Sequence, residues 1–300
     1  MPFFSVVIPT YNRAEKLKLT IESVLRQTYG NFELLIMDDG STDHTESVVN
    51  DFKDTRIHYH WAPNSGGPAT PRNRGILKAA APWITFLDAD DLWYPNRLFE
   101  IEKSITKNSE IDVFSHNEML TTPDNQEKRL LQYGPYESDF YRVLLTKGNR
   151  LSTSATTIRT SFLIQNELRF NESPDYVIIE DYDLWLRMAF LNAKFLFIQE
   201  ALGEYIIEDD NISNSIEKID KNQRNMMREH VYNIQQFDSD RDKLWQDVCL
   251  RLDFEKFRSY LRSGKTFQGI QLMLRSLFFN PISFTRIIAV KLTVKLSGVP

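Results

Sequence analysis

Short apolar runs alternate with stretches of helical periodicity over the first hundred residues. The runs predict strands at residues 3–8, 32–37, 56–61 and 84–87. Helices are predicted between and after them, at residues 14–27, 43–52, 71–80 and 95–107. In the first helix, Leu17, Ile21 and Val24 share one face. Strands that alternate with helices predict an α/β fold, with a mostly parallel sheet covered by helices on both faces.

The alternation is lost after a strand expected at residues 111–115. Residues 117–153 are polar and irregular, which predicts a long loop of the kind that forms binding sites. We expect contacts with an acceptor substrate there. Beyond this loop, a helix is predicted at residues 180–191, followed by short strands near 194–198 and 202–207.

The pattern becomes almost wholly helical from about residue 216. We therefore expect an α/β domain over residues 1–215 and a helical region over residues 216–300. No acidic residue follows Glu255, and residues 256–300 interleave lysine and arginine with leucine, isoleucine and phenylalanine. This combination suits either peripheral contact with an anionic membrane or a helical subdomain with a solvated basic face. The strict alternation over Val290–Leu296 argues against a clean amphipathic helix.

Composition and charge narrow the class of protein. The 300 residues are 42% hydrophobic with a net charge of −5, which predicts a globular chain with no overall attraction for nucleic acid. Its one cysteine, Cys249, cannot form an internal disulfide, which fits a reducing compartment. Residues 1–9 are expected to be a strand and not a secretory signal, and no apolar window is long enough for a membrane span. We expect a cytoplasmic protein, either soluble or at the cytoplasmic face of a membrane.

Three carboxylates, those of Asp88, Asp90 and Asp91, follow the apolar run at residues 84–87. The carboxyl end of a buried strand is where open α/β sheets bind their ligands. Ionised carboxylates so close together repel each other, and Mg²⁺ or Mn²⁺ shared with a substrate phosphate would relieve that repulsion. The segment therefore predicts a metal and a phosphorylated substrate, with a merely solvated acidic loop as the alternative.

Four segments in order resemble the motifs of family 2 glycosyltransferases, which have the GT-A fold. They are Val6–Asn12, Ser23–Tyr29, Asp38–Asp43 and Phe86–Asp91. The resemblance is strong over about the first hundred residues, is looser to about residue 215, and does not cover the helical region. It implies an inverting transferase that moves a sugar from a nucleotide diphosphate donor to an acceptor hydroxyl.

The resemblance also implies residue roles by position. The nucleotide contacts would be Pro9, Thr10, Tyr11, Asp39, Arg72 and Asp88. Among these, Asp39 would hold the base and Asp88 the ribose, whereas Asp90 would hold the metal that bridges the diphosphate. Asp91 would either support this segment or cap a following helix. Without the family motifs, Asp39 would be an ordinary turn residue and Arg72 a solvated arginine at a helix end.

The pair Glu180–Asp181 resembles the acidic motif that carries the catalytic base. Asp181 takes that role by position, with Glu180 in support; the alternative is that both acids only favour a helix N-terminus. Two departures from the family pattern stand out. The chain lacks the Gln-x-x-Arg-Trp motif of processive synthases, which favours transfer of one sugar per encounter. Glu208 replaces a histidine found in many relatives, and is either an oxygen donor near the metal or a surface acid.

The sequence thus predicts a metal-dependent, inverting, non-processive glycosyltransferase. The expected donor is a UDP-sugar, with a dTDP-sugar as the alternative. The acceptor would be a glycan, lipid-linked or protein-linked hydroxyl in the synthesis of cell-surface polysaccharide or glycoconjugate. The sugar, the linkage and the oligomeric state are left open. Rival hypotheses are a catalytically silent nucleotide-sugar-binding scaffold, and a sugar nucleotidyltransferase, whose usual glycine-rich basic loop is missing after the first strand.

Overall fold

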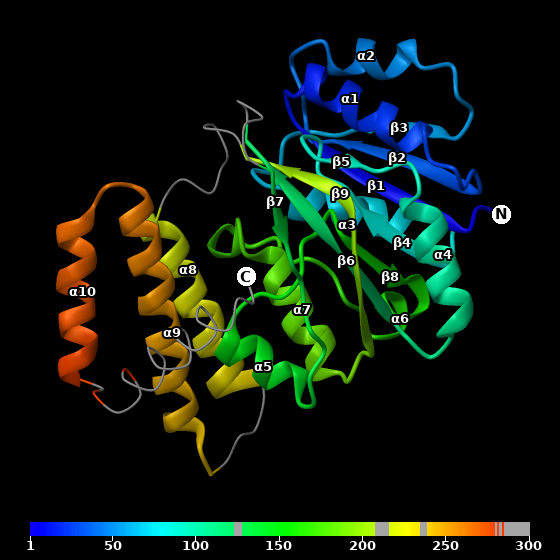
Figure 1. The fold of residues 1–300 in the computed structure, drawn as a ribbon. Helices are drawn as coiled ribbons and strands as arrows, with labels where there is room; N and C mark the ends of the chain where they lie inside the picture. The colour runs from blue at the N-terminus through cyan, green and yellow to red at the C-terminus, as the bar shows by residue number, and fades with distance from the viewer. Residues whose placement is uncertain (123–127, 208–215, 235–238, 280, 282–283, 285–300) are drawn as a thin grey trace. The chain divides into compact units, whose positions relative to one another are not determined.

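The apolar runs at the start of the chain form neighbouring strands of one sheet (Figure 1). The structure is a computed structural model that describes residues 1–122, 128–207, 216–234, 239–279, 281 and 284. Within these residues the sheet has nine strands, which run in the order β3-β2-β1-β4-β8-β6-β9-β5, with β7 paired to β6. The chain divides into two compact units, Met1–Tyr141 with Asn149–Asn211 and Arg142–Gly148 with Ile212–Pro300. The predicted boundary near residue 215 stays a prediction.

The first unit contains the sheet and the helices around it. Its strands are β1 (Phe4–Thr10), β2 (Phe32–Asp38), β3 (Ile57–Trp61), β4 (Trp83–Phe86), β5 (Leu92–Trp93), β6 (Val113–Thr121), β7 (Lys128–Leu131), β8 (Thr156–Arg159) and β9 (Phe195–Ile206). Its helices are α1 (Ala14–Leu25), α2 (Thr45–Asp51), α3 (Ala69–Lys78), α4 (Arg97–Lys107), α6 (Thr160–Gln165), the 3₁₀ turn η1 (Pro174–Tyr176) and α7 (Glu180–Phe190). Helix α5 (Phe140–Lys147) begins in this unit and ends in the second one.

Side chains alternate between the two faces of β1, and helices cover both faces (Figure 1). Phe4, Val6 and Ile8 belong to a core that also contains residues of α1 and α4. Val7 faces the opposite way, toward α3, where a Cβ on Gly75 would lie 2.3 Å from a Val7 methyl carbon. Glycine at position 75 therefore allows α3 to lie against the sheet, as the α/β prediction requires.

The sheet is purely parallel in its first half and mixed in its second half, where β6 and β9 still pair in parallel. Strands β1, β2, β3 and β4 pair in parallel, as the alternating pattern predicts. Strand β8 runs antiparallel between β4 and β6, and β5 runs antiparallel to β9. The prediction of a mostly parallel sheet therefore holds for the first hundred residues, and the rest of the sheet is mixed.

Two predictions for the middle of the chain are wrong. Residues 117–153 are not one irregular loop, because they include most of β6, all of β7 and α5. The two short strands expected near 194–198 and 202–207 are one strand, β9, which follows β6 through register shifts around Asn117. These shifts let a long strand continue past polar positions that interrupt its apolar pattern.

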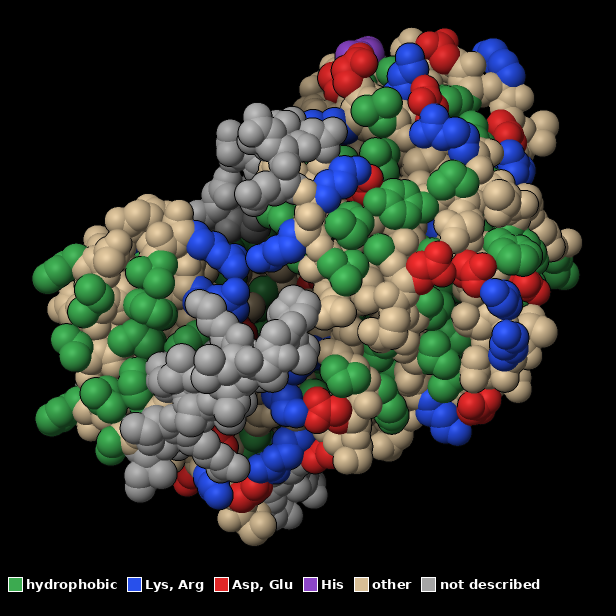
Figure 2. Space-filling model, viewed as in Figure 1, with side chains coloured by type: hydrophobic (Ala, Val, Ile, Leu, Met, Phe, Trp, Pro, Cys, Tyr) green, Lys and Arg blue, Asp and Glu red, His purple; other side chains and the backbone are tan. Residues whose placement is uncertain are grey.

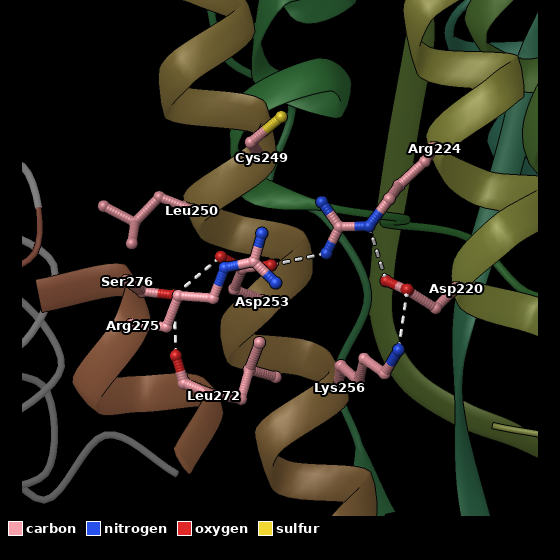
Figure 3. Close-up of a pocket in the computed structure, with 9 residues that line it drawn as sticks. All are labelled: Asp220, Arg224, Cys249, Leu250, Asp253, Lys256, Leu272, Arg275 and Ser276. Carbon is pink, nitrogen blue, oxygen red and sulfur yellow. Dashed lines mark hydrogen bonds and ion pairs between the residues drawn. The ribbon is translucent and has the colours of Figure 1, made fainter. Parts of the chain in front are cut away.

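The second unit is helical. It contains α8 (Ile216–Glu229), the π-helical turn η3 (His230–Ile234), α9 (Arg241–Arg262) and α10 (Thr266–Phe279). Ion pairs join its helices around a pocket of about 410 Å³ (Figure 3): Arg224 of α8 contacts Asp253 of α9 at 2.5 Å, and Lys256 contacts Asp220 at 3.0 Å. In neither unit does a described helix combine the length and the apolar character needed to cross a bilayer.

Candidate functional site

The carboxyl ends of β1, β2 and β4 bring the predicted motifs to one edge of the sheet. Thr10 pairs with Asp38 in parallel register, and the Asp39 backbone N–H donates to the Thr10 carbonyl at 2.9 Å. The Leu87 N–H donates to the Val7 carbonyl at 3.1 Å, so the segment with the three aspartates leaves the sheet beside β1. Pro9, Thr10, Asp39 and Asp88 therefore lie at the same edge, as expected for a ligand site of an open α/β sheet.

Side chains fix the loops that follow β1 and β2. The Asn12 side-chain oxygen accepts a hydrogen bond from the Thr42 N–H at 2.7 Å, and the Asn12 N–H donates to Ser41 Oγ at 2.9 Å. Gly40 has φ +86°, and a Cβ there would lie 2.6 Å from the Asn64 backbone nitrogen. Only glycine fits this turn, because it tolerates both the left-handed backbone and the close approach.

Asp39, the predicted base contact, is 3% exposed and already has partners. One carboxylate oxygen accepts from the Ser65 N–H at 2.9 Å, and the other forms an ion pair with Arg74. A nucleotide base that binds Asp39 would have to share these oxygens. Tyr11, by contrast, is 48% exposed, so its ring is available for contact with a ligand.

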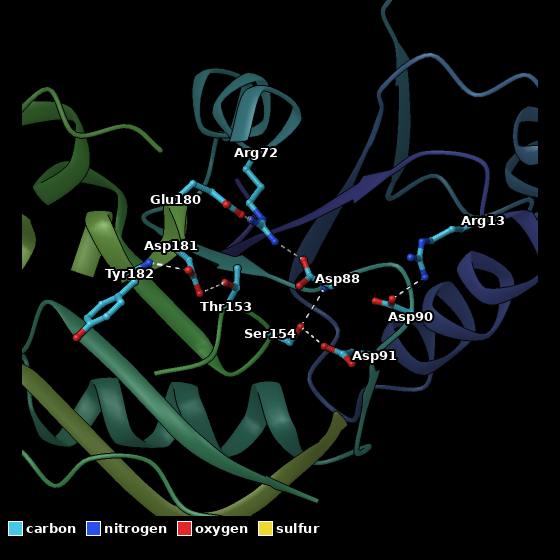
Figure 4. A network of polar contacts seen from close by, with 10 residues as sticks. All are labelled: Arg13, Arg72, Asp88, Asp90, Asp91, Thr153, Ser154, Glu180, Asp181 and Tyr182. Atoms are coloured by element: carbon cyan, nitrogen blue, oxygen red, sulfur yellow. Dashed lines mark hydrogen bonds and ion pairs between the residues drawn. The ribbon is translucent and has the colours of Figure 1, made fainter. Parts of the chain in front are cut away.

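Each carboxylate after β4 has its own partner (Figure 4). Arg72 contacts Asp88 and Arg13 contacts Asp90, both at 2.6 Å. Burial raises the pKa of Asp90, the Asp88 carboxylate raises it further, and the Arg13 guanidinium opposes both effects. The predicted repulsion between the carboxylates is therefore present, and two arginines partly neutralise it.

Asp91 is a buried structural carboxylate. It accepts a hydrogen bond from Ser154 Oγ at 2.6 Å and from the Ile206 backbone N–H at 3.0 Å. The Asp88 backbone N–H donates to the same Ser154 hydroxyl at 3.1 Å, so Ser154 links the two aspartates. The alternative that Asp91 caps a helix is wrong, because strand β5 begins at the next residue.

Arg72 connects the two acidic motifs (Figure 4). Its guanidinium is 4% exposed and lies 2.6 Å from Glu180 Oε1 and 2.6 Å from Asp88 Oδ1. Burial disfavours the charged guanidinium, but the Asp88 and Glu180 carboxylates outweigh burial and raise the Arg72 pKa. Arg72 is therefore not a solvated arginine at a helix end. It joins the loop after β4 to the first residue of α7.

Asp181, the predicted base, is half-buried beside this junction. It accepts hydrogen bonds from the Tyr182 N–H at 2.6 Å and from Thr153 Oγ1 at 3.2 Å. Burial and the neighbouring Glu180 carboxylate raise its pKa, the Arg72 guanidinium opposes them, and the resulting pKa is about 7. A carboxylate with a pKa near neutrality can take up a proton during a reaction and release it afterwards.

The carboxylate oxygens at this site suit a metal ion that is also coordinated by a substrate. No group of three or more His, Cys, Asp or Glu side chains that could hold a metal occurs in the part of the chain that the structure describes. Mg²⁺ and Mn²⁺ nevertheless need only one or two protein carboxylates when phosphates and water supply the other oxygens. Asp90 meets that requirement. Glu208, the other candidate oxygen donor, lies outside the described residues.

Four residues of the site escape sequence analysis: Arg13, Ser65, Thr153 and Ser154. Arg13 directly follows the Val6–Asn12 motif, and this position is the only signal that could have singled it out. The hydroxyl residues carry no local signal, because serine and threonine are common in loops. Their partners lie 26 to 66 residues away in the chain.

Comparisons with known sequences identify the family. Residues 5–165 match the family model "Glycosyl transferase family 2". Escherichia coli WfgD, a UDP-Glc:alpha-D-GlcNAc-diphosphoundecaprenol beta-1,3-glucosyltransferase, is 28% identical over 76% of this chain and 87% of its own length. The glycosyltransferase MJ1057 of Methanocaldococcus jannaschii is 30% identical over 72% of this chain and 75% of its length. A Rickettsia felis glycosyltransferase is 46% identical over 37% of this chain, but the match spans only 18% of that relative.

Solved structures show the same fold. Staphylococcus aureus TarS 1–349 in complex with UDP-GlcNAc aligns with a TM-score of 0.64 and 23% identity over 84% of this chain and 72% of that one. The Pyrobaculum calidifontis mannosyltransferase PcManGT, in complex with GDP-Man and Mn²⁺, aligns with a TM-score of 0.60 and 14% identity over 98% and 81%. The predicted GT-A fold with a helical C-terminal region is confirmed. The chain is thus a glycosyltransferase that belongs to glycosyl transferase family 2.

Proposed function

We propose that the protein transfers one sugar per encounter from a UDP-sugar to an acceptor hydroxyl, with inversion at the anomeric carbon. The main support is the Arg72 bridge, which connects the Asp88 carboxylate to the helix that begins with Glu180 and Asp181. The bridge thereby holds the residues proposed to bind the nucleotide-sugar donor and the carboxylate proposed to take up the proton in one site. Positioning of this kind supplies a large part of the rate enhancement in group transfer.

The proposal divides the site into a donor part and an acceptor part. In the donor part, Tyr11 and Asp39 contact the base, Asp88 contacts the ribose, and Asp90 holds Mn²⁺ or Mg²⁺. Such a cation neutralises charge on a diphosphate leaving group. In the acceptor part, Asp181 takes the proton of the attacking hydroxyl, and the Thr153 hydroxyl orients the carboxylate through its hydrogen bond.

The names of two related proteins suggest the substrates. WfgD is named for transfer from UDP-Glc to a sugar on diphosphoundecaprenol, and TarS binds UDP-GlcNAc. We therefore propose a UDP-sugar as donor and a lipid-linked sugar as acceptor, in cell-surface polysaccharide or glycoconjugate synthesis. The protein would then work at the cytoplasmic face of the membrane.

A donor panel tests the donor part of the proposal. The full chain is incubated with UDP-, dTDP- and GDP-sugars and Mn²⁺ or Mg²⁺ without acceptor, and release of nucleoside diphosphate is measured. We expect slow release from a UDP-sugar and none from Asp90→Ala. Asp54→Ala is the matched control, because Asp54 also pairs with an arginine at 2.6 Å but lies outside the site. Equal release by the Asp90→Ala variant would overturn the role of Asp90.

Asp181→Asn tests the acceptor part. The amide cannot take up the hydroxyl proton, so transfer to an added acceptor should be abolished while binding of UDP stays within about twofold. Isothermal titration with UDP measures the binding, and chromatography of the acceptor measures the transfer. Transfer at the wild-type rate would remove Asp181 from the role of base.

A further inference from the structure

Helix α10 carries its large apolar side chains on the exposed side. The exposed fractions are 77% for Phe267, 51% for Ile270, 62% for Leu274, 38% for Leu277 and 82% for Phe278. Their spacing places all five on one face of the helix, which we call the α10 apolar face. Figure 2 shows hydrophobic side chains gathered over this helix. Single exposed apolar residues are ordinary, but a contiguous row marks an interaction surface.

The opposite side of α10 includes Gly269 and Ser276, and it is fixed against α9. Gly269 is buried, and a Cβ there would lie 3.0 Å from the Phe257 ring. Ser276 donates a hydrogen bond to Asp253 at 2.6 Å, and Asp253 also contacts Arg224 (Figure 3). Rotation of α10 would break the hydrogen bond between Ser276 and Asp253 and leave that Asp253 oxygen without its donor. The helix is therefore held with its apolar face outward.

Basic residues accompany this face. Arg258 of α9 and Lys265 in the connection between α9 and α10 are exposed. No acidic residue occurs after Glu255, so the charged residues from 256 to 300 are all basic. An exposed apolar row beside lysine and arginine matches the requirements of an anionic bilayer surface, where apolar side chains enter the acyl boundary and cations contact the headgroups.

We infer that the α10 apolar face docks the protein on an anionic lipid surface. Phe267, Leu274 and Phe278 insert between headgroups, and the neighbouring basic residues contact lipid phosphates. The inference rests on the proposed function only in that a lipid-linked acceptor lies in a membrane. Vesicle binding requires no donor, metal or acceptor, so its failure would leave the transferase proposal untouched.

The test is co-sedimentation of the full chain with vesicles of phosphatidylcholine, with and without phosphatidylglycerol. We expect binding to the anionic vesicles and at least about tenfold weaker binding by Leu274→Gln/Phe278→Gln, because two large apolar side chains no longer enter the lipid. The matched control is Leu77→Gln/Ile164→Gln, which changes residues that are 71% and 54% exposed on other helices. This control should bind like wild type.

A second variant measures how much the basic side chains contribute to vesicle binding. Arg258→Gln/Lys265→Gln should weaken binding to anionic vesicles by about tenfold or more, since each surface cation contributes about 1 kcal/mol. Thermal unfolding establishes that every variant is folded. The inference is overturned if the wild type does not bind, if it binds neutral vesicles equally well, or if Leu274→Gln/Phe278→Gln binds like wild type. Self-association that this variant abolishes, without vesicle binding, would instead assign the face to a second copy of the chain.

Discussion

Replacement of Thr153 by valine should shift the pH dependence of transfer. The change keeps the shape of the side chain but removes the hydroxyl that donates to Asp181 Oδ2 at 3.2 Å. A hydrogen bond to a charged group contributes about 1.5–3 kcal/mol, and this one is long, so we take the lower end. About 1.4 kcal/mol corresponds to one pKa unit, so the Asp181 pKa should rise from about 7 by about one unit.

The direction of the effect follows from the role of a base. Asp181 must be deprotonated, so kcat/KM rises with pH through its pKa and levels off above it. In Thr153→Val the ionised fraction at pH 7 falls from about half to about a tenth, which predicts a loss of about fivefold at pH 7. Above about pH 9 the variant should recover the wild-type value. The assay is transfer to acceptor from about pH 6 to 10 at subsaturating donor.

Thr160→Val is the matched control for this prediction. Thr160 is 7% exposed against 6% for Thr153, and its hydroxyl donates to the Ala81 carbonyl. It should cost similar stability without moving the midpoint of the profile. The reasoning is refuted if Thr153→Val lowers the plateau and leaves the midpoint in place, because the hydroxyl would then have only a structural role.

Three further substitutions test the site and its scaffold. Arg72→Met leaves the buried Glu180 and the partly exposed Asp88 without their cation and should lower the free energy of unfolding by about 3 kcal/mol in a urea titration; a loss below about 1 kcal/mol would contradict the bridge. Gly75→Ala forces a Cβ against a valine of β1 and should cost about 1–3 kcal/mol, whereas Gly30→Ala, with no contact closer than 3.9 Å, should stay within about 0.5 kcal/mol. Arg13→Gln frees Asp90 from its ion pair and should raise Mn²⁺ affinity by up to about fivefold in a calorimetric titration. Weaker Mn²⁺ binding would show that Arg13 helps to form the metal site.

Local pattern predicts the first half of the fold because its central elements, such as β1 and α1, are buried in a regular way. β1 is buried along its whole length, and α1 turns Leu17, Ile21 and Val24 toward the core. A strand or helix whose apolar residues recur with a clear period can be recognised without knowing which distant residues it packs against.

Prediction from the sequence fails in the middle of the chain because polar residues are buried there. Asn117 and Glu118 lie in β6 with 1% and 0% exposure, although their polarity indicates a loop. The Asn117 side chain donates to the Gln199 carbonyl, and Glu118 accepts from the Tyr133 hydroxyl. Buried polar groups are stable when they are hydrogen-bonded, but these partners come from other strands and segments. No local periodicity can reveal them.

In the candidate site, too, local motifs are predictable from the sequence and contacts between distant residues are not. The motifs identify Asp88, Asp90 and Asp181, because acidic side chains in fixed order are visible in a sequence. The contacts that tune them are not visible: Arg72 reaches Glu180 across 108 positions, and Ser154 reaches Asp91 across 63. Sequence motifs thus identify the carboxylates, and only the fold shows which cation or hydroxyl contacts each of them.

The Arg72 bridge also limits how the chain can evolve. A mutation that removes the arginine alone leaves Asp88 and Glu180 as uncompensated acids, and a mutation that removes one acid leaves a buried guanidinium N–H without its acceptor. Each single step passes through a damaged intermediate. Residues 72, 88 and 180 should therefore be inherited as one unit, and a lineage that abandons one of them should change the others as well.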